Sequence, residues 1–264
     1  MTNSIEEALE KMNKNRVWDN EPVFCFTSDI DWASEAILSL FFEQIEIYNL
    51  KLTTFVTHSS PIIDALFKKN RLERGIHPNF LQNSSHGKTF KEVIENCVQY
   101  APEAKGFRSH RLFDVSDITH LLKNEYGFRY VSNLGTILAT NVRPLLHESG
   151  LIHFPIFFED GTHLYNSMHL NINRFENYFK TPGIKIISFH PMNFVLNSPN
   201  FQFMRQIKDS MTRTEFNQLN TPEIKRLQNT KAGIKETIEQ IFDMVSKNNY
   251  KVFSLSELYH YSMS

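Results

Sequence analysis

The sequence predicts an α/β protein with a mostly parallel sheet, either open or closed into a barrel. Short apolar runs typical of buried strands alternate along the chain with longer stretches whose apolar residues recur at helical spacing. Strands that alternate with helices pair in parallel, because each helix carries the chain back to the starting edge of the sheet. At 264 residues, with no repeat and no convincing linker, the chain is long enough for one such domain.

The first strand is predicted over residues 23–27, and a helix over about 33–48 follows it with apolar residues every three or four positions. The later strands are expected at 52–56, about 75–77, 105–108, 128–132, 151–158, 184–189 and 251–254. The later helices are expected at 62–70, about 90–100, 116–125 and about 232–248. Residues 197–231 are polar with weak helical patterning, and we expect them to form an excursion beside the functional site of a single domain spanning 1–264.

Composition excludes several classes of function. The formal net charge is −1, so no global field recruits nucleic acid or an anionic membrane. The two cysteines, Cys25 and Cys97, lie in apolar patterns and are expected to be core residues without a disulfide framework. The N-terminal stretch has neither the apolar core of a signal peptide nor a membrane span. We therefore expect a cytoplasmic protein with no nucleic-acid partner and no integral membrane segment, and its oligomeric state stays open.

Two carboxylates, Asp29 and Asp31, follow the first predicted strand directly. Carboxylates at the end of a buried strand must be neutralised, because an unpaired charge away from water is very costly. The two acids lie two residues apart, so on a continuing strand both would face the same side. One can bind a divalent cation while the other takes a proton from water that the cation activates. The alternative for Asp31 is the N-cap of the following helix, whose first turn is acidic.

Two histidines are candidates for the other metal ligands. His77 follows a short apolar run and precedes a proline, which ends the strand there, and His86 lies in a loop before a glycine. Two neutral imidazoles and one carboxylate form a common zinc site with room for water and substrate. We expect Asp31, His77 and His86 to hold one divalent ion, with zinc favoured and Asn79 as the alternative third ligand.

Arg108 stands at the end of a later predicted strand. A guanidinium there can hold a carboxylate such as Asp29 in one orientation and keep it ionised. The alternative is a surface salt bridge. His110 and Arg111, which follow closely, could contact a substrate.

His190 ends the strongly apolar strand 184–189 and precedes a proline. An imidazole that titrates near neutrality suits the protonation of a leaving amine. Asp160 follows another predicted strand and could hydrogen-bond this imidazole and raise its pKa. The pattern favours a catalytic role for the pair.

These candidates share one placement, because all of them fall at or just beyond predicted strand ends. The carboxyl ends of parallel strands meet at one edge of the sheet, where functional residues of α/β folds gather. The residues are Asp29, Asp31, His77, Arg108, Asp160 and His190. Together they outline a metal-dependent hydrolase site. The chain has no phosphate-binding glycine-rich loop and no serine-nucleophile elbow.

Several of these stretches carry a resemblance to a known family. The stretches are Thr27–Asp31, Gly75–His77, Phe107–His110, Phe189–His190 and Tyr250–Leu258. They resemble motifs of the polysaccharide deacetylase (NodB-homology) family, carbohydrate esterase family 4, most closely in the branch found in bacterial O-antigen gene clusters. The resemblance runs from about residue 21 to the end of the chain. Leu81 stands where the family has its second metal histidine, and the arginine motif lacks its proline and tyrosine.

The resemblance implies a NodB-like distorted (β/α) barrel of about seven strands. It implies hydrolysis of an N-acyl group, acetyl or formyl, from an amino sugar, with Asp29 as the base, Asp31 as a metal ligand and His190 as the general acid. The expected substrate is a nucleotide- or lipid-linked intermediate of surface polysaccharide (O-antigen) biosynthesis. Two alternatives stay open: a catalytically inactive carbohydrate-binding relative, and another metal-dependent amidase or phosphodiesterase on a similar barrel.

Overall fold

The computed structural model describes residues 5–264 and contains one sheet of ten strands. The strands run in the order β6-β7-β5-β4-β3-β2-β1-β9-β8, and β10 also pairs with β1. The bounds are β1 (Pro22–Asp29), β2 (Leu52–Val56), β3 (Leu72–Ile76), β4 (Gly106–Phe107), β5 (Tyr130–Val131), β6 (Leu145–Leu146), β7 (Ile152–His153), β8 (Ile156–Glu159), β9 (Gly183–Phe189) and β10 (Lys251–Val252). Within the described residues, the named strands pair in parallel except β6 with β7.

The sheet curls into a distorted barrel whose ring follows β1, β2, β3, β4, β5, β8 and β9. The chain just after β5 closes this ring, because Gly135 forms a parallel bridge with Ile156 of β8. The amide of Thr136 also donates to the carbonyl of Ile156 at 2.9 Å. The prediction of a distorted (β/α) barrel of about seven strands is therefore confirmed.

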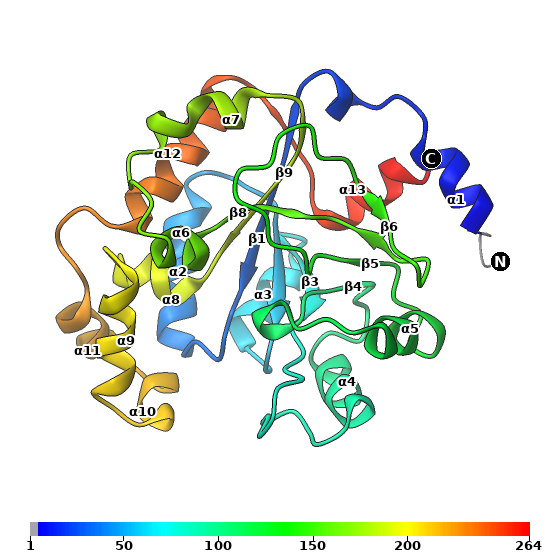
Figure 1. Cartoon of the computed structure of the whole chain (residues 1–264). Helices are drawn as coiled ribbons and strands as arrows, with labels where there is room; N and C mark the ends of the chain where they lie inside the picture. The colour runs from blue at the N-terminus through cyan, green and yellow to red at the C-terminus, as the bar shows by residue number, and fades with distance from the viewer. Residues whose placement is uncertain (1–4) are drawn as a thin grey trace.

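Helices cover the outside of the barrel, and Figure 1 shows α2, α8 and α12 gathered on one side of the strands and α4 and α5 on another. Their bounds are α1 (Ile5–Met12), α2 (Glu35–Glu46), α3 (Pro61–Lys68), α4 (Phe90–Tyr100), α5 (Ser116–Asn124), α6 (Asp160–Tyr165), α7 (Glu176–Lys180), α8 (Pro191–Leu196), α9 (Phe201–Asp209), α10 (Arg213–Asn217), α11 (Thr221–Leu227), α12 (Ile234–Lys247) and α13 (Leu255–Ser262). No helix among residues 5–264 is long and apolar enough to cross a lipid bilayer.

Alternation along β1 decides which of its side chains face the barrel interior. Val23 and Cys25 belong to an inner apolar cluster, whereas Phe24 and Phe26 belong to the larger cluster that packs the helices onto the barrel. The inner cluster comprises Trp18, Val23, Cys25, Phe55, Tyr130, Ile152, Phe154, Ile184, Ile186, Leu255 and Leu258. The same alternation places Asp29 in the interior at the carboxyl end of the barrel.

The structure corrects one expectation about the strands. The single strand predicted over 151–158 is two strands, β7 and β8, which pair with different neighbours, β5 and β9. Pro155 stands between them and has no N–H to continue a ladder.

The polar segment 197–231 contains three short helices, α9 to α11, which lie beside α8 at the lower left of Figure 1. Each helix buries only one or two apolar residues and leaves the rest exposed or half-buried, and such short patterns are weak in a sequence. Side chains of α9 and α10 line the cleft described below, so this segment does stand beside the candidate site.

Candidate active site

A buried ion pair joins Asp29 and Arg108 at the carboxyl end of the barrel. Arg108 is fully buried, and its Nη1 donates to Asp29 Oδ1 at 2.8 Å. The guanidinium also donates to the side chains of Thr27 and Ser188 and to Ser132, so it links β1, β9 and the end of β5 across the interior. These contacts fix the position of the Asp29 carboxylate beside a buried cation. The alternative of a surface salt bridge is excluded for Arg108.

Replacing Arg108 by methionine is expected to lower the free energy of unfolding by about 3–5 kcal/mol, because Asp29 would keep a buried charge without its cation. Urea denaturation followed by circular dichroism measures this loss. Adding Asp29→Asn to that variant removes the stranded charge and should recover part of the stability. Exposed Arg205 on α9 gives the control, since Arg205→Met should change stability by less than about 0.5 kcal/mol. Equal losses in the single and double variants would contradict this account.

A carboxylate and two imidazoles converge just beyond β1, β3 and β4. Asp31 Oδ1 lies 3.2 Å from His77 Nε2 and 3.1 Å from His110 Nδ1. The three candidate ligand atoms lie within 4.8 Å of one another. Burial by itself would raise the pKa of Asp31, but the hydrogen bonds from His110 and His77 hold it well below its usual range. One ionised carboxylate and two imidazoles are a donor set that fits a divalent metal ion such as zinc.

The backbone at Asp31 adopts a conformation that L-residues rarely take. Asp31 and Trp32 both have left-handed φ values, 42° and 57°. Such strain in bulky residues persists only where the surrounding structure enforces it, and it is common at functional sites. The N-cap of α2 is Ser34, whose hydroxyl accepts from the amide of Ile37. Asp31 is therefore not the helix cap that the sequence left as an alternative.

His86, expected as the third metal ligand, does not join this group in the structure. Its Nδ1 accepts from the backbone amide of Asn79 at 3.1 Å, and its Nε2 lies 2.9 Å from the carbonyl of Thr57. Burial lowers the pKa of His86 to about 4, which keeps the ring neutral. Asn79, the alternative, is also engaged, since its Oδ1 accepts from the amide of Leu81 at 3.1 Å. Both residues hold the loop together, and His110 stands in the third position.

His190 and Asp160 form a second acid–imidazole pair. His190 Nδ1 lies 2.6 Å from Asp160 Oδ1, and the His190 amide donates to Asp160 Oδ2 at 2.9 Å. His190 Nε2 faces Asp31 Oδ2 at 3.8 Å. Burial would lower the pKa of His190, but the charge and hydrogen bond of fully buried Asp160, with the charges of Asp31 and Asp29, raise it well above its usual value. The imidazole can therefore hold a proton at Nε2 beside the three-residue group.

Two residues of the site were not predicted from the sequence. They are His110 as a candidate metal ligand and Glu159 in the cleft. His110 follows Arg108 by two residues, and that spacing was the one signal available for it. Glu159 ends β8, lines the cleft beside His190 and accepts from the hydroxyl of Thr162. Burial raises the pKa of Glu159. Glu159, Asp160 and His190 also lie within 4.8 Å, but Asp160 already accepts from His190 and from the amide of Gly161. Asp31 and its two histidines are therefore the candidate metal position.

These residues open into a cleft with two lobes. The first lobe, about 380 Å³, contains His190 and Glu159, and the second, about 390 Å³, contains Trp32 and Asn79. The lobes share the lining residues Asp31, His110, Arg111, Lys208 and Phe216. Asp31 and His110 of the three-residue group thus lie where the two lobes meet, and a substrate could occupy both lobes.

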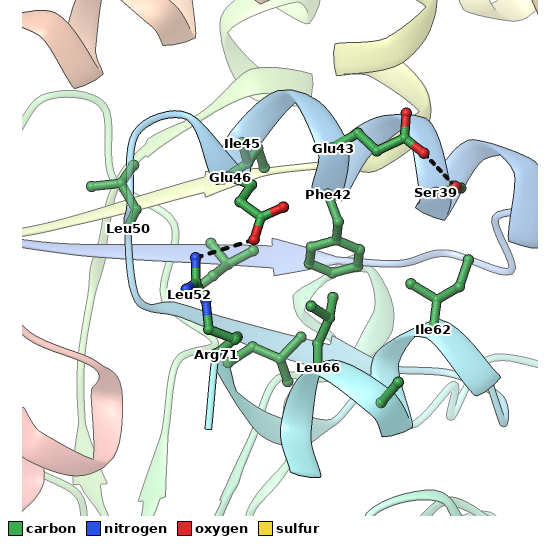
Figure 2. A pocket seen from close by; sticks show the side chains of 12 residues that line it. Ser39, Phe42, Glu43, Ile45, Glu46, Leu50, Leu52, Ile62, Leu66 and Arg71 are labelled. Carbon is green, nitrogen blue, oxygen red and sulfur yellow. Dashed lines mark hydrogen bonds and ion pairs between the residues drawn. The ribbon is translucent and has the colours of Figure 1, made fainter. Parts of the chain in front are cut away.

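Figure 2 shows another hollow of about 270 Å³ on the outside of the barrel, between α2 and α3. Its lining is mostly apolar, and Figure 2 shows an ion pair between Glu46 and Arg71, 3.4 Å apart, at its edge. No histidine or cysteine lines this hollow. Its two acids, Glu43 and Glu46, already pair with Ser39 and Arg71, so the candidate site is the cleft.

The comparisons with known proteins decide the family. The family model of the WbmS-like polysaccharide deacetylases matches residues 26–208. This stretch includes the Asp29–Arg108 pair, the Asp160–His190 pair and the three-residue group. The chain belongs to this family. A family of polysaccharide deacetylases comprises hydrolases that act on acetyl groups, so this WbmS-like chain is a hydrolase of that kind. No curated protein matches the sequence.

One solved structure agrees with this WbmS-like assignment. A protein from Bordetella bronchiseptica, described as a polysaccharide deacetylase involved in O-antigen biosynthesis, is 25% identical with a TM-score of 0.72, covering 83% of this chain and 89% of that one. A family 4 acetyl xylan esterase from Clostridium thermocellum, in complex with a cobalt ion, is 14% identical with a TM-score of 0.44 and 90% of each chain covered. A Streptococcus mutans carbohydrate esterase of family 4 is 10% identical with a TM-score of 0.47, covering 95% and 90%.

Proposed function

We propose that this deacetylase is a metal-dependent amidase that removes an N-acyl group, acetyl or formyl, from an amino sugar. The observation that supports this most is that two side chains beside the Asp31–His77–His110 group, Asp29 and His190, are each held in place by a buried partner. One is a carboxylate held by a buried arginine, and the other is an imidazole whose pKa is raised by a buried aspartate. Amide hydrolysis needs both a base for water and an acid for the leaving nitrogen.

Asp31, His77 and His110 would hold one divalent ion, with zinc favoured by two imidazole ligands. When bound, the ion would polarise the acyl carbonyl and lower the pKa of water. Asp29 is the base in this proposal, and Arg108 is a positioning residue that holds its carboxylate in one orientation. His190 donates its Nε2 proton to the leaving nitrogen, and Asp160 positions the ring through Nδ1. A binding protein without activity would have no need for these two buried pairs.

We also propose that the substrate is an intermediate of surface polysaccharide (O-antigen) biosynthesis, linked to a nucleotide or a lipid carrier. The Bordetella bronchiseptica relative, described as involved in O-antigen biosynthesis, supports the pathway. The two-lobed cleft has room for a sugar and part of a carrier. A nucleotide-linked substrate would place the reaction in the cytoplasm. Release of acetate or formate from N-acylated amino sugars, free and carrier-linked, tests this function, and no release from any of them by zinc-replete protein would contradict it.

The proposed metal ligands give a separate prediction. Asp31→Ala, His77→Ala and His110→Ala should each purify with less than about a tenth of the wild-type metal, because each removes one of three protein ligands. His86→Ala should keep the metal, since both ring nitrogens of His86 make other contacts. Elemental analysis after dialysis measures the content, and circular dichroism checks the fold. Metal loss in His86→Ala with full retention in His110→Ala would restore the expectation from the sequence.

A further inference from the structure

The second lobe of the cleft carries an excess of positive charge. Its lining includes Arg111, Lys208 and Arg213, which we call the basic rim. Asp31 is the one carboxylate among the lining residues, and it faces His77 and His110. The whole chain has a formal net charge of −1, so a general excess of basic residues does not explain this cluster. The lobe is therefore suited to an anion.

The basic rim is assembled from two distant parts of the chain. Arg111 follows β4, whereas Lys208 lies on α9 and Arg213 begins α10. All three are exposed, and none forms a salt bridge with a carboxylate within residues 5–264. Lys208 lies over the ring of Phe216 at 5.3 Å and Arg213 over Trp32 at 5.0 Å. Contacts with ring faces do not use up the N–H groups of the ammonium and the guanidinium, which can still donate to a ligand.

The backbone around Arg111 is held in a strained form that a merely exposed arginine does not require. Arg111 and Leu112 have left-handed φ values of 56° and 54°. The hydrogen bond from the Leu112 amide to the carbonyl of Ser109, at 2.9 Å, closes this turn directly after the buried Arg108. The turn thereby places the backbone of Arg111 at the junction of the two lobes, next to His110 of the candidate metal position.

We propose that the basic rim binds the phosphate or diphosphate that joins the amino sugar to its carrier, an inference that rests on the proposed function. Guanidinium groups donate paired hydrogen bonds to phosphate oxygens, and a lysine adds a compact positive charge. The sugar would then extend past His110 toward His190 and Glu159 in the first lobe. In this arrangement the basic rim selects carrier-linked sugars over neutral glycosides. The phosphate chemistry is the same for a nucleoside diphosphate and a prenyl diphosphate.

Binding of uridine diphosphate to the zinc-loaded protein tests the basic rim without relying on turnover. The variants are Lys208→Gln, Arg213→Gln, their double variant, and Arg111→Gly, which suits the left-handed backbone. Isothermal titration should show the dissociation constant for uridine diphosphate rising roughly tenfold or more in the double variant, as expected for lost charged hydrogen bonds. Arg205→Gln removes a charge that lies on the same helix, α9, but does not line the cleft. It should change the dissociation constant for uridine diphosphate less than about twofold. Uridine should bind far more weakly than uridine diphosphate.

Two further arms separate the possible outcomes. In the second arm, geranyl diphosphate replaces uridine diphosphate. Tighter binding of one of the two indicates whether the carrier is a prenyl chain or a nucleotide, and equal affinities mean that the protein recognises the phosphates alone. In the third arm, Arg213→Gln, at a residue that lines the second lobe but not the first, should raise KM for a nucleotide-linked N-acetyl amino sugar more than KM for its methyl glycoside. If no sugar is hydrolysed, the proposed function fails while the binding arms still decide the basic rim. Equal affinity of wild type and double variant for both diphosphates would overturn the proposal.

Discussion

Replacing Asp29 by asparagine is expected to lower kcat by about 10²–10⁴ while metal content and fold are kept, as for removal of a general base. Asparagine has nearly the same shape as aspartate and can still accept from Arg108 Nη1, which lies 2.8 Å from Oδ1 in the wild type. It cannot take a proton from water at working pH. The loss should therefore appear in kcat, measured as acetate release from an N-acetyl amino sugar that the wild type hydrolyses.

The matched control for this variant is Ser28→Ala, one residue earlier on the same strand. Ser28 is buried and bonds to Thr54 at 3.3 Å, away from the ion pair, so its loss should cost stability without a large effect on kcat. Elemental analysis of Asp29→Asn must show wild-type metal for the comparison to hold. Turnover by that variant within a few-fold of wild type, with metal bound, would rule Asp29 out as the base.

Replacing His190 by alanine is expected to lower kcat on amide substrates by about 10²–10⁴, with a much smaller effect on KM. An amine anion is a very poor leaving group, so the nitrogen must gain a proton as the C–N bond breaks. An activated aryl ester of the same acyl group expels an aryl oxide that needs no proton, so the rate of its hydrolysis should fall far less. Equal losses on amide and ester would mean that His190 binds substrate or supports the fold.

The pH profile gives a second readout for His190. Asp160, Asp31 and Asp29 raise its pKa well above the ordinary value, so the protonated form persists into neutral and mildly alkaline solution. Activity on amides should be lost as the pH rises through that raised pKa. Asp160→Asn removes the largest stabilising charge, so the alkaline limb should move to lower pH. An unmoved limb would show that another group sets it.

The sequence identified both buried pairs because each member stands at the end of an apolar run. Asp29, Arg108 and His190 follow strands whose burial is legible in the residues themselves, and parallel strands end at one edge. The structure brings Arg108 to Asp29 and Asp160 to His190 as expected. Strand ends are therefore readable from local patterns, and the contacts between them follow from the fold class.

The third ligand position could not be read in the same way. His86 and His110 both lie in irregular segments, where the conformation of a few residues decides which way a side chain points. His110 is placed by a short turn that contains left-handed Arg111, and His86 is turned away by its contact with the Asn79 amide. Neither interaction leaves a periodic signal in the sequence.

Two of the shortest strands, β6 and β7, were missed or merged for a related reason. β6 and β7 have two residues each, too few for any alternation to show. Their existence depends on neighbouring strands supplying hydrogen-bond partners, which is information from distant parts of the chain.

Anomalous diffraction at the zinc absorption edge, from crystals of zinc-loaded protein, tests the central claim most directly. We expect one strong peak about 2.0–2.2 Å from a carboxylate oxygen of Asp31 and from ring nitrogens of His77 and His110, with His86 still bound to the Asn79 amide. A peak ligated by His86, or none among these residues in zinc-loaded crystals, would contradict the account.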